Sequence, residues 1–178
     1  LGKPKFSIPS FEGSTDPEDY LAWELKIEKL WRLHDYTDDK KVKLAASEFD
    51  GYALRWWDSI VQNRREDNQL PVLTWREMKA IMRARFVPTN YLRTVFDKLT
   101  QLKQGTMSVD EYYMEMEMLM QRARVRESIE MTLQRFLHGL KLQLKSIVRH
   151  HKYETMNDLL HHAREAESQL AEEAKVKS

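Results

Sequence analysis

The chain has 178 residues, and its 29 Lys and Arg almost balance its 28 Asp and Glu, leaving a net charge of +1. That balance argues against a polycation that binds nucleic acid through charge alone. The absence of cysteine excludes disulfides, thiolate metal sites and thiol nucleophiles.

The length allows one or two small domains. No apolar run approaches the roughly 20 residues that cross a bilayer, and no secretory signal opens the chain, so no membrane partner is expected. Because the first residue is Leu1 rather than Met, we expect the chain to be a piece of a longer protein.

Residues 1–15 predict an extended arm, because two Pro, two Gly and isolated apolar residues show no helical period. Apolar residues spaced in this way pack against a groove in a core or against a neighbouring molecule. Phe6 and Ile8 are therefore candidate contacts for self-association or for a partner.

Four helices are predicted between residues 16 and 86. Asp16 before Pro17 is typical of a helix start, Thr37 can cap a second helix, and Thr74 with Glu77 predicts a capping box. The five Trp lie on apolar helix faces and not in a basic groove, which favours core packing over base stacking. We expect Trp57, beside Trp56, to reach the surface and count it among the candidate contacts.

Pro88 cannot continue the fourth helix and restricts Val87 to extended backbone. We therefore place a domain boundary here, between a first lobe of residues 1–87 and a second lobe of residues 88–178. Val87, Pro88 and Thr89 are the predicted hinge.

Five further helices are predicted in the second lobe. Asn90, Ser108, Ser128 and Thr155 are the expected caps, with a capping box from Ser108 to Glu111 and a helix stop at Gly105. In the seventh helix, Ile129 is expected to face inward with Leu133 and Phe136. No segment alternates with a period of two, so no strand is expected.

The run Met114, Met116, Met118, Met120 has two interpretations. Met116 and Met120 belong to the inner face of their helix, whereas Met114 and Met118 lie one turn apart outside it. Adaptable methionines on an outer face are typical of interaction surfaces. The alternative is a wide apolar stripe buried between helices.

The usual signatures of catalysis and cofactor binding are missing. The sequence contains no phosphate-binding glycine loop and no nucleophile elbow. The pairs His150-His151 and His161-His162 are poor metal sites, because adjacent helical residues point about 100° apart. We expect no enzyme, no metal and no cofactor.

Short motifs in fixed order resemble the capsid region of Ty3/Gypsy-type retrotransposon Gag. They cover roughly residues 6–170 and begin with Phe11-Glu12-Gly13, Asp16-Pro17, Tyr20-Leu21 and Trp56-Trp57. The others are Met78-Lys79, Arg85-Phe86-Val87-Pro88, Tyr91, Lys98-Leu99, Leu102, Gln104-Gly105, Ser108-Val109, Glu111-Tyr112, Arg135-Phe136-Leu137 and Gly139-Leu140.

This resemblance implies an all-α fold of two small helical-bundle lobes, an N-terminal and a C-terminal capsid-like lobe joined by a short hinge. It implies a non-catalytic protein that self-assembles as a homo-oligomer into a particle shell around the element's RNA. RNA binding in the family usually belongs to a cysteine-containing nucleocapsid segment, which is absent from this chain. The implied location is the cytoplasm, with part of the cycle in the nucleus.

Residues Gln104, Gly105, Ser108, Glu111 and Tyr112 also resemble the retroviral major homology region. Ser108 occupies the position of a glutamate in the retroviral pattern, and Met116 occupies that of an arginine. We therefore expect a capping box and an apolar helix face to replace the usual polar network.

Two other functions remain as hypotheses. A domesticated Gag-derived adaptor would dimerise through the second lobe and bind partner peptides through Met114, Met118 and the arm. A direct RNA-binding protein would use the basic patches Lys40-Lys41-Lys43 and Arg64-Arg65.

Overall fold

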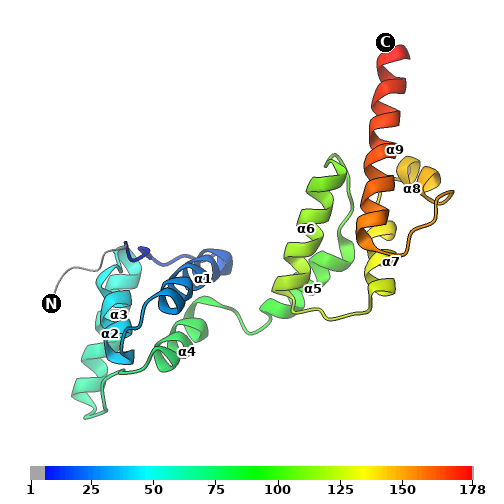
Figure 1. The fold of residues 1–178 in the computed structure, drawn as a ribbon. Coiled ribbons are helices and arrows are strands. Elements are labelled where there is room, and N and C mark those ends of the chain that lie inside the picture. The colour runs from blue at the N-terminus through cyan, green and yellow to red at the C-terminus, as the bar shows by residue number, and fades with distance from the viewer. Residues whose placement is uncertain (1–6, 178) are drawn as a thin grey trace. The chain divides into compact units, whose positions relative to one another are not determined.

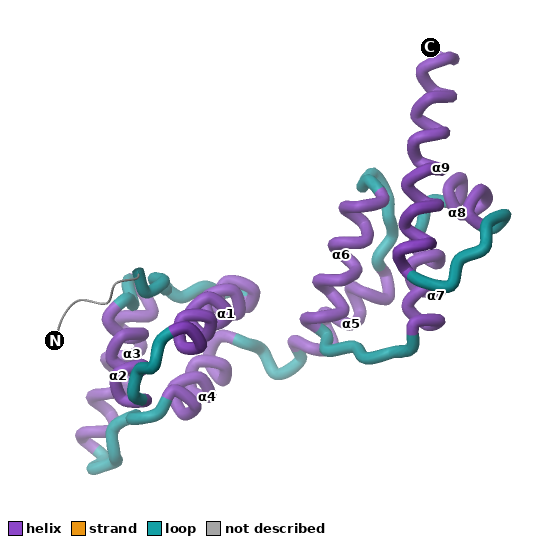
Figure 2. Tube along the Cα trace, in the orientation of Figure 1, coloured by secondary structure: helices purple, strands orange, loops and turns teal. Residues whose placement is uncertain are grey.

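The computed structural model describes residues 7–177, which form helices and loops in two compact units that divide between Thr89 and Asn90 (Figure 1). Among these residues there is no strand, and a single isolated bridge pairs Phe11 with Phe49 (Figure 2). This all-α, two-lobe architecture confirms the predicted fold class. The predicted Phe6 contact lies outside the described residues.

The described part of the first unit contains four helices, and side-chain caps begin the first and the last of them. The second and third helices start at Thr37 and Asp50 without a side-chain cap bond, so the cap predicted at Thr37 is not formed. Asp16 accepts a hydrogen bond from the Glu18 amide at 3.0 Å, and Thr74 accepts one from the Glu77 amide at 3.2 Å. The Glu77 carboxylate bonds to Arg64 at 2.8 Å, so it is engaged elsewhere than in the predicted capping box. The helices are α1 (Pro17–Leu33), α2 (Asp38–Ser47), α3 (Gly51–Glu66) and α4 (Trp75–Phe86).

Aromatic side chains fill the core of this unit. The Trp23 ring lies 5.4 Å from Phe11 and 6.0 Å from Trp75, measured between centroids. Met78 and Met82 of α4 are fully buried beneath them. The buried core also contains Tyr20, Ile27, Trp31, Val42, Ala45, Phe49, Ala53, Trp57 and Phe86. The tryptophans therefore stabilise the fold, as their helical spacing predicted.

The N-terminal arm is part of the first core. The Phe11 amide donates to the Glu48 carbonyl at 3.1 Å, and the Asp50 amide donates to the Phe11 carbonyl at 3.0 Å. The Trp23 indole also donates to the Pro9 carbonyl at 2.9 Å. The arm therefore packs in its own unit, against the loop between α2 and α3.

Within residues 90–177, the second unit contains five helices with a separate core. They are α5 (Tyr91–Gln101), α6 (Val109–Arg122), α7 (Ile129–Gly139), α8 (Leu142–Val148) and α9 (Met156–Lys177). Helix α6 packs against α5 and α9, and α9 also contacts α7 and α8. Tyr112, Met116, Phe136 and Leu159 are among its most deeply buried side chains. The last turns of α9 extend beyond the other helices of this unit (Figure 1).

Two local predictions in this unit were wrong. Ile129 is 66% exposed because it occupies the first turn of α7, before that helix reaches the core. Gly105 does not end α5, because Leu102 is the C-cap residue and adopts extended backbone. Gly105 lies three residues later in a tight turn, where its φ of +56° suits glycine.

Candidate functional site

Gln104, in the segment between α5 and α6, connects this segment to the α7–α8 junction through hydrogen bonds. This side chain is 1% exposed. Its amide nitrogen donates to the Met107 carbonyl at 3.0 Å, and its amide oxygen accepts from the Lys141 backbone at 3.0 Å. The Gln104 backbone amide donates to the Gly139 carbonyl at 2.8 Å. Because buried amides require partners, this closed set of bonds fixes one loop against the other.

Tyr112 and Gly139 complete the same junction. The Tyr112 hydroxyl donates to the Phe136 carbonyl at 2.9 Å, and its ring stacks on Phe136 at 5.0 Å between centroids. Burial raises the pKa of Tyr112 to about 12. A Cβ on Gly139 would collide with the Tyr112 hydroxyl and lie 2.6 Å from the Leu102 carbonyl. Only glycine therefore fits where α7 meets the loop.

The start of α6 is the predicted capping box. Ser108 accepts from the Glu111 amide at 3.1 Å, and the Glu111 carboxylate accepts from the Ser108 amide at 3.0 Å. Hydrogen bonding to the carboxylate from Ser108, first from its backbone amide and then from its side chain, holds the pKa of the Glu111 carboxyl below its usual range. Helix α9 also contributes here, since Glu167 accepts from the Val109 amide at 2.8 Å.

Of the residues that resemble the major homology region, Gln104 and Tyr112 contact the α7–α8 junction. Ser108 and Glu111 form the cap of α6, and Gly105 lies in the turn between Gln104 and that cap. The expected capping box is present, but the expectation that it and an apolar helix face would replace the polar network was incomplete, because Gln104 supplies buried polar contacts of its own. Sequence reasoning could not identify its partner, since Lys141 is 37 residues away in the chain.

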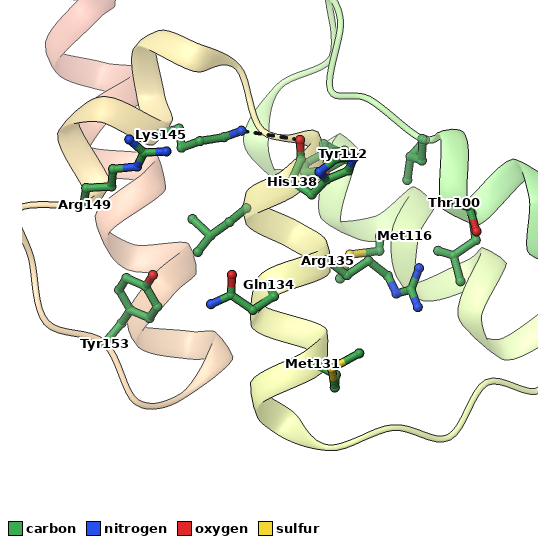
Figure 3. A pocket seen from close by; sticks show the side chains of 13 residues that line it. Thr100, Tyr112, Met116, Met131, Gln134, Arg135, His138, Lys145, Arg149 and Tyr153 are labelled. Atoms are coloured by element: carbon green, nitrogen blue, oxygen red, sulfur yellow. Dashed lines mark hydrogen bonds between the residues drawn. The ribbon is translucent and has the colours of Figure 1, made fainter.

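A pocket of about 620 Å³ lies beside this junction, between α5, α6, α7 and α8 (Figure 3). Its apolar floor includes Leu99, Leu102 and Met116. Lys145 of α8 and Arg149, the residue directly after α8, approach from one side, with the Lys145 ammonium directed at the His138 carbonyl (Figure 3). The remaining lining residues are Thr100, Tyr112, Met131, Gln134, Arg135, Leu137, His138 and Tyr153.

The Lys, Arg, Asp and Glu residues that line the pocket are all basic. Its lining contains Arg135, Lys145 and Arg149 and no carboxylate. Glu127, outside the lining, neutralises Arg135 through a bond of 3.0 Å, and this pairing holds the pKa of the Glu127 carboxyl below its usual range. Among the described residues, no carboxylate forms an ion pair with Lys145 or Arg149. The pocket therefore combines apolar surface with two cations available to an incoming acidic group.

The predicted contact residues fall into two classes. Met114 is 60% exposed and Met118 is 43% exposed, on the outer side of α6. Ile8 and Trp57 are each 8% exposed and pack within the first core. Trp57 is turned inward beside Phe49, and its neighbour Trp56 is the more exposed of the pair. The predictions that Ile8 and Trp57 offer surface contacts were therefore wrong.

The predicted hinge residues connect the units. Val87 is the extended C-cap of α4, and Pro88 and Thr89 belong to no helix. The units divide directly after Thr89, two residues beyond the boundary expected from Pro88. Hinge motion at this segment stays a prediction.

A buried ion pair in the first unit had no sequence signal. Glu24 of α1 is 5% exposed and accepts two hydrogen bonds from Arg83 of α4, one at 2.8 Å, and one from Tyr20 at 2.7 Å. Burial raises the pKa of the Glu24 carboxyl, but hydrogen bonds from Arg83 and Tyr20 outweigh burial and lower it overall. This pair joins the first and last helices of the unit.

The histidines show no chelating arrangement. His151 and His162 stack at 4.4 Å between ring centroids, and His161 lies 3.2 Å from Glu165. Over residues 7–177, no cluster of three or more His, Asp or Glu side chains is placed to hold a metal ion. Within the same range, no helix is long and apolar enough to cross a membrane.

Comparisons with known proteins match both units. Residues 5–87 match the N-terminal capsid-like domain of the retrotransposon-derived protein PEG10, and residues 96–170 match the C-terminal capsid-like domain of PEG10/RTL1. The activity-regulated cytoskeleton associated protein 1 of Drosophila melanogaster is 26% identical over 181 residues, which cover 96% of this chain and 68% of that protein.

Solved structures show the same fold. The structure of the dArc1 capsid matches with a TM-score of 0.68 and 22% identity, covering 95% of this chain and 99% of that one. The structure of the dArc2 capsid matches with a TM-score of 0.78 and 19% identity, with the same coverage. The N-terminal capsid-like match falls on the first helical unit and the C-terminal capsid-like match falls on the second, which is the order expected for a Gag capsid region. The chain is a Gag capsid-like region of Ty3/Gypsy origin, built of an N-terminal and a C-terminal capsid-like domain.

Proposed function

We propose that this chain is a structural protein whose copies assemble through homotypic domain contacts into a particle shell. The observation that carries the proposal is the outer face of α6, where Met114 and Met118 lie exposed and outside both hydrophobic cores. Adaptable apolar side chains in such a position favour a protein–protein contact. The capsid structures of dArc1 and dArc2, which share the fold, support this function.

We further propose that the shell packages RNA through a nucleocapsid segment outside this chain. The net charge of +1 supports this division, because phosphate binding requires clustered Lys and Arg. Neither domain is proposed to catalyse a reaction.

Sedimentation velocity and electron microscopy over a range of protein and salt concentrations test assembly. We expect species larger than dimers, growing with concentration. Met114→Ser with Met118→Ser should weaken growth, whereas the matched control Val176→Ser, at the end of α9, should not. A protein that stays monomeric under all conditions, including in its full-length context, would contradict the proposal.

The same methionines also favour the second candidate, a domesticated adaptor that binds partner peptides. That protein would form a stable dimer at every concentration. Growth beyond the dimer therefore distinguishes the shell from the adaptor.

A further inference from the structure

Two surfaces of the C-terminal domain have complementary chemistry. The first, which we call the α6 patch, consists of Met114, Glu117, Met118 and Gln121. These residues are all exposed and follow one another at intervals of three or four along α6, so they share a face. The second surface is the pocket between α5, α6, α7 and α8.

The α6 patch is apolar and acidic. Its two methionines offer flexible apolar side chains, and Glu117 lies between them. Helix α6 as a whole carries Asp110, Glu111, Glu115 and Glu117 against one base, Arg122. Asp110 is paired with Arg164, Glu111 is engaged in the capping box, and Glu115 is only partly exposed and lies outside the patch. Glu117, which interacts with the Tyr113 hydroxyl, is the acid on the patch itself.

The pocket has the opposite character. Its floor is apolar, and its lining supplies Lys145 and Arg149 without any carboxylate. Methionine side chains match such a floor in chemistry, and a glutamate beside them would meet these two cations. Charge complementarity of this kind guides the orientation of a contact and suppresses wrong partners.

The patch cannot enter the pocket of its own domain. Tyr112 and Met116, which line the pocket, lie on the inner side of α6. Met114 and Met118 each lie two residues further along, roughly 200° around the helix. The two surfaces therefore face away from each other, and any occupant from α6 must come from a second molecule.

We infer that the α6 patch of one copy docks in the pocket of another copy. The contact is heterologous: each C-terminal domain offers its patch to one neighbour and its pocket to a different one. Such contacts close into rings or extend as filaments, whereas an isologous contact stops at a dimer. This inference rests on the proposed assembly function and names the surfaces that it would use.

The absence of native cysteine allows a direct test by disulfide cross-linking. Met118→Cys places a thiol on the patch, and Gln134→Cys places one at the pocket. When the two variants are mixed, with one carrying a tag that changes its mass, we expect the mixed dimer to exceed either self-dimer severalfold. A chain carrying both cysteines should give a ladder of trimers and larger products.

The matched control replaces Met118→Cys with Glu172→Cys, an exposed position on α9. Equal yield from this control would show random collision and overturn the inference. If the chains form large assemblies but the Met118→Cys and Gln134→Cys variants do not cross-link, the inference fails while the proposed function stands. If neither assembly nor cross-linking occurs, both fail.

A charge exchange tests the same contact without cysteines. Glu117→Lys and Arg149→Glu should each weaken association roughly threefold to tenfold, and the double variant should recover most of the loss. Circular dichroism checks that each variant is folded. A labelled RNA oligonucleotide tests the competing interpretation. The inference is wrong, and the pocket binds phosphate, if the wild type binds this RNA, if Arg149→Glu abolishes that binding, and if no cross-link forms.

Discussion

At the scale of single residues, Gly139 is the more sterically constrained of the two glycines in the C-terminal domain. Gly139→Ala would place a methyl group against the Leu102 backbone carbonyl and against the Tyr112 hydroxyl, which burial and its bond to the Phe136 carbonyl hold in place. We expect a loss of about 2–3 kcal/mol in the free energy of unfolding, measured by urea denaturation.

Gly105→Ala is the matched control for that substitution. A Cβ at Gly105 meets no atom within 4 Å, and only its φ of +56° disfavours alanine. We expect a cost of about 1 kcal/mol. Equal losses for the two variants would show that backbone conformation, and not the collision with Tyr112, is what matters at Gly139.

Gln104 is the second constraint at this scale. Gln104→Leu preserves bulk but leaves the Met107 carbonyl and the Lys141 amide without their side-chain partner. We expect about 2 kcal/mol of destabilisation by urea denaturation. Gln101→Leu, at an exposed position at the end of α5, should change stability by less than about 0.5 kcal/mol. A neutral Gln104→Leu variant would mean that water replaces the amide.

At the scale of elements, Glu24 and Arg83 join α1 to α4, and this pair makes stability depend on pH. The pKa of Glu24 is lower in the folded protein than its ordinary value of 4.5. The stabilisation of the folded state by the Glu24 carboxylate is therefore complete above pH 4.5, and it is lost as the pH falls through the pKa of Glu24 in the folded protein.

Glu24→Gln removes this titration. We expect it to destabilise the N-terminal domain by about 1–3 kcal/mol near neutral pH, with the difference from wild type shrinking as the pH falls below the ordinary carboxyl pKa of 4.5. Urea unfolding at several pH values measures this. The exposed Glu48→Gln should leave the pH dependence unchanged. A Glu24→Gln difference that stays constant at all these pH values would contradict the assignment.

Elements whose signals are local could be predicted from sequence. Asp16, Thr74 and Ser108 begin helices because the groups they cap are within three residues. Arg83 and Glu24 are 59 residues apart, so no local pattern indicates their contact. The helical period also failed to predict which of Trp56 and Trp57 is buried. These adjacent residues lie on either side of the apolar face of α3, and the contact of Trp57 with Phe49 determines that Trp57 is the buried one.

At the scale of the whole molecule, each domain has its own core, and the two cores share no buried residue in the described part of the chain. We therefore expect two separable unfolding transitions. Met82→Ala and Met116→Ala remove equivalent fully buried side chains from the first and second core. Each should cost about 2–5 kcal/mol and shift only its own transition in calorimetry. A single transition shifted by both variants would contradict independent domains.

The arm has a consequence for the order of folding. Phe11 contacts Phe86 at 4.9 Å between ring centroids, so the core of the N-terminal domain is closed by residues from its two ends. During synthesis, Phe11 emerges from the ribosome long before α4, so its contact with Phe86 forms only after α4 has also emerged. The aromatic cluster is completed only once the ribosome has passed Pro88. The N-terminal domain is thus finished at the moment the connection to the next domain emerges, and a nascent chain that stalls earlier exposes unpaired aromatic surface.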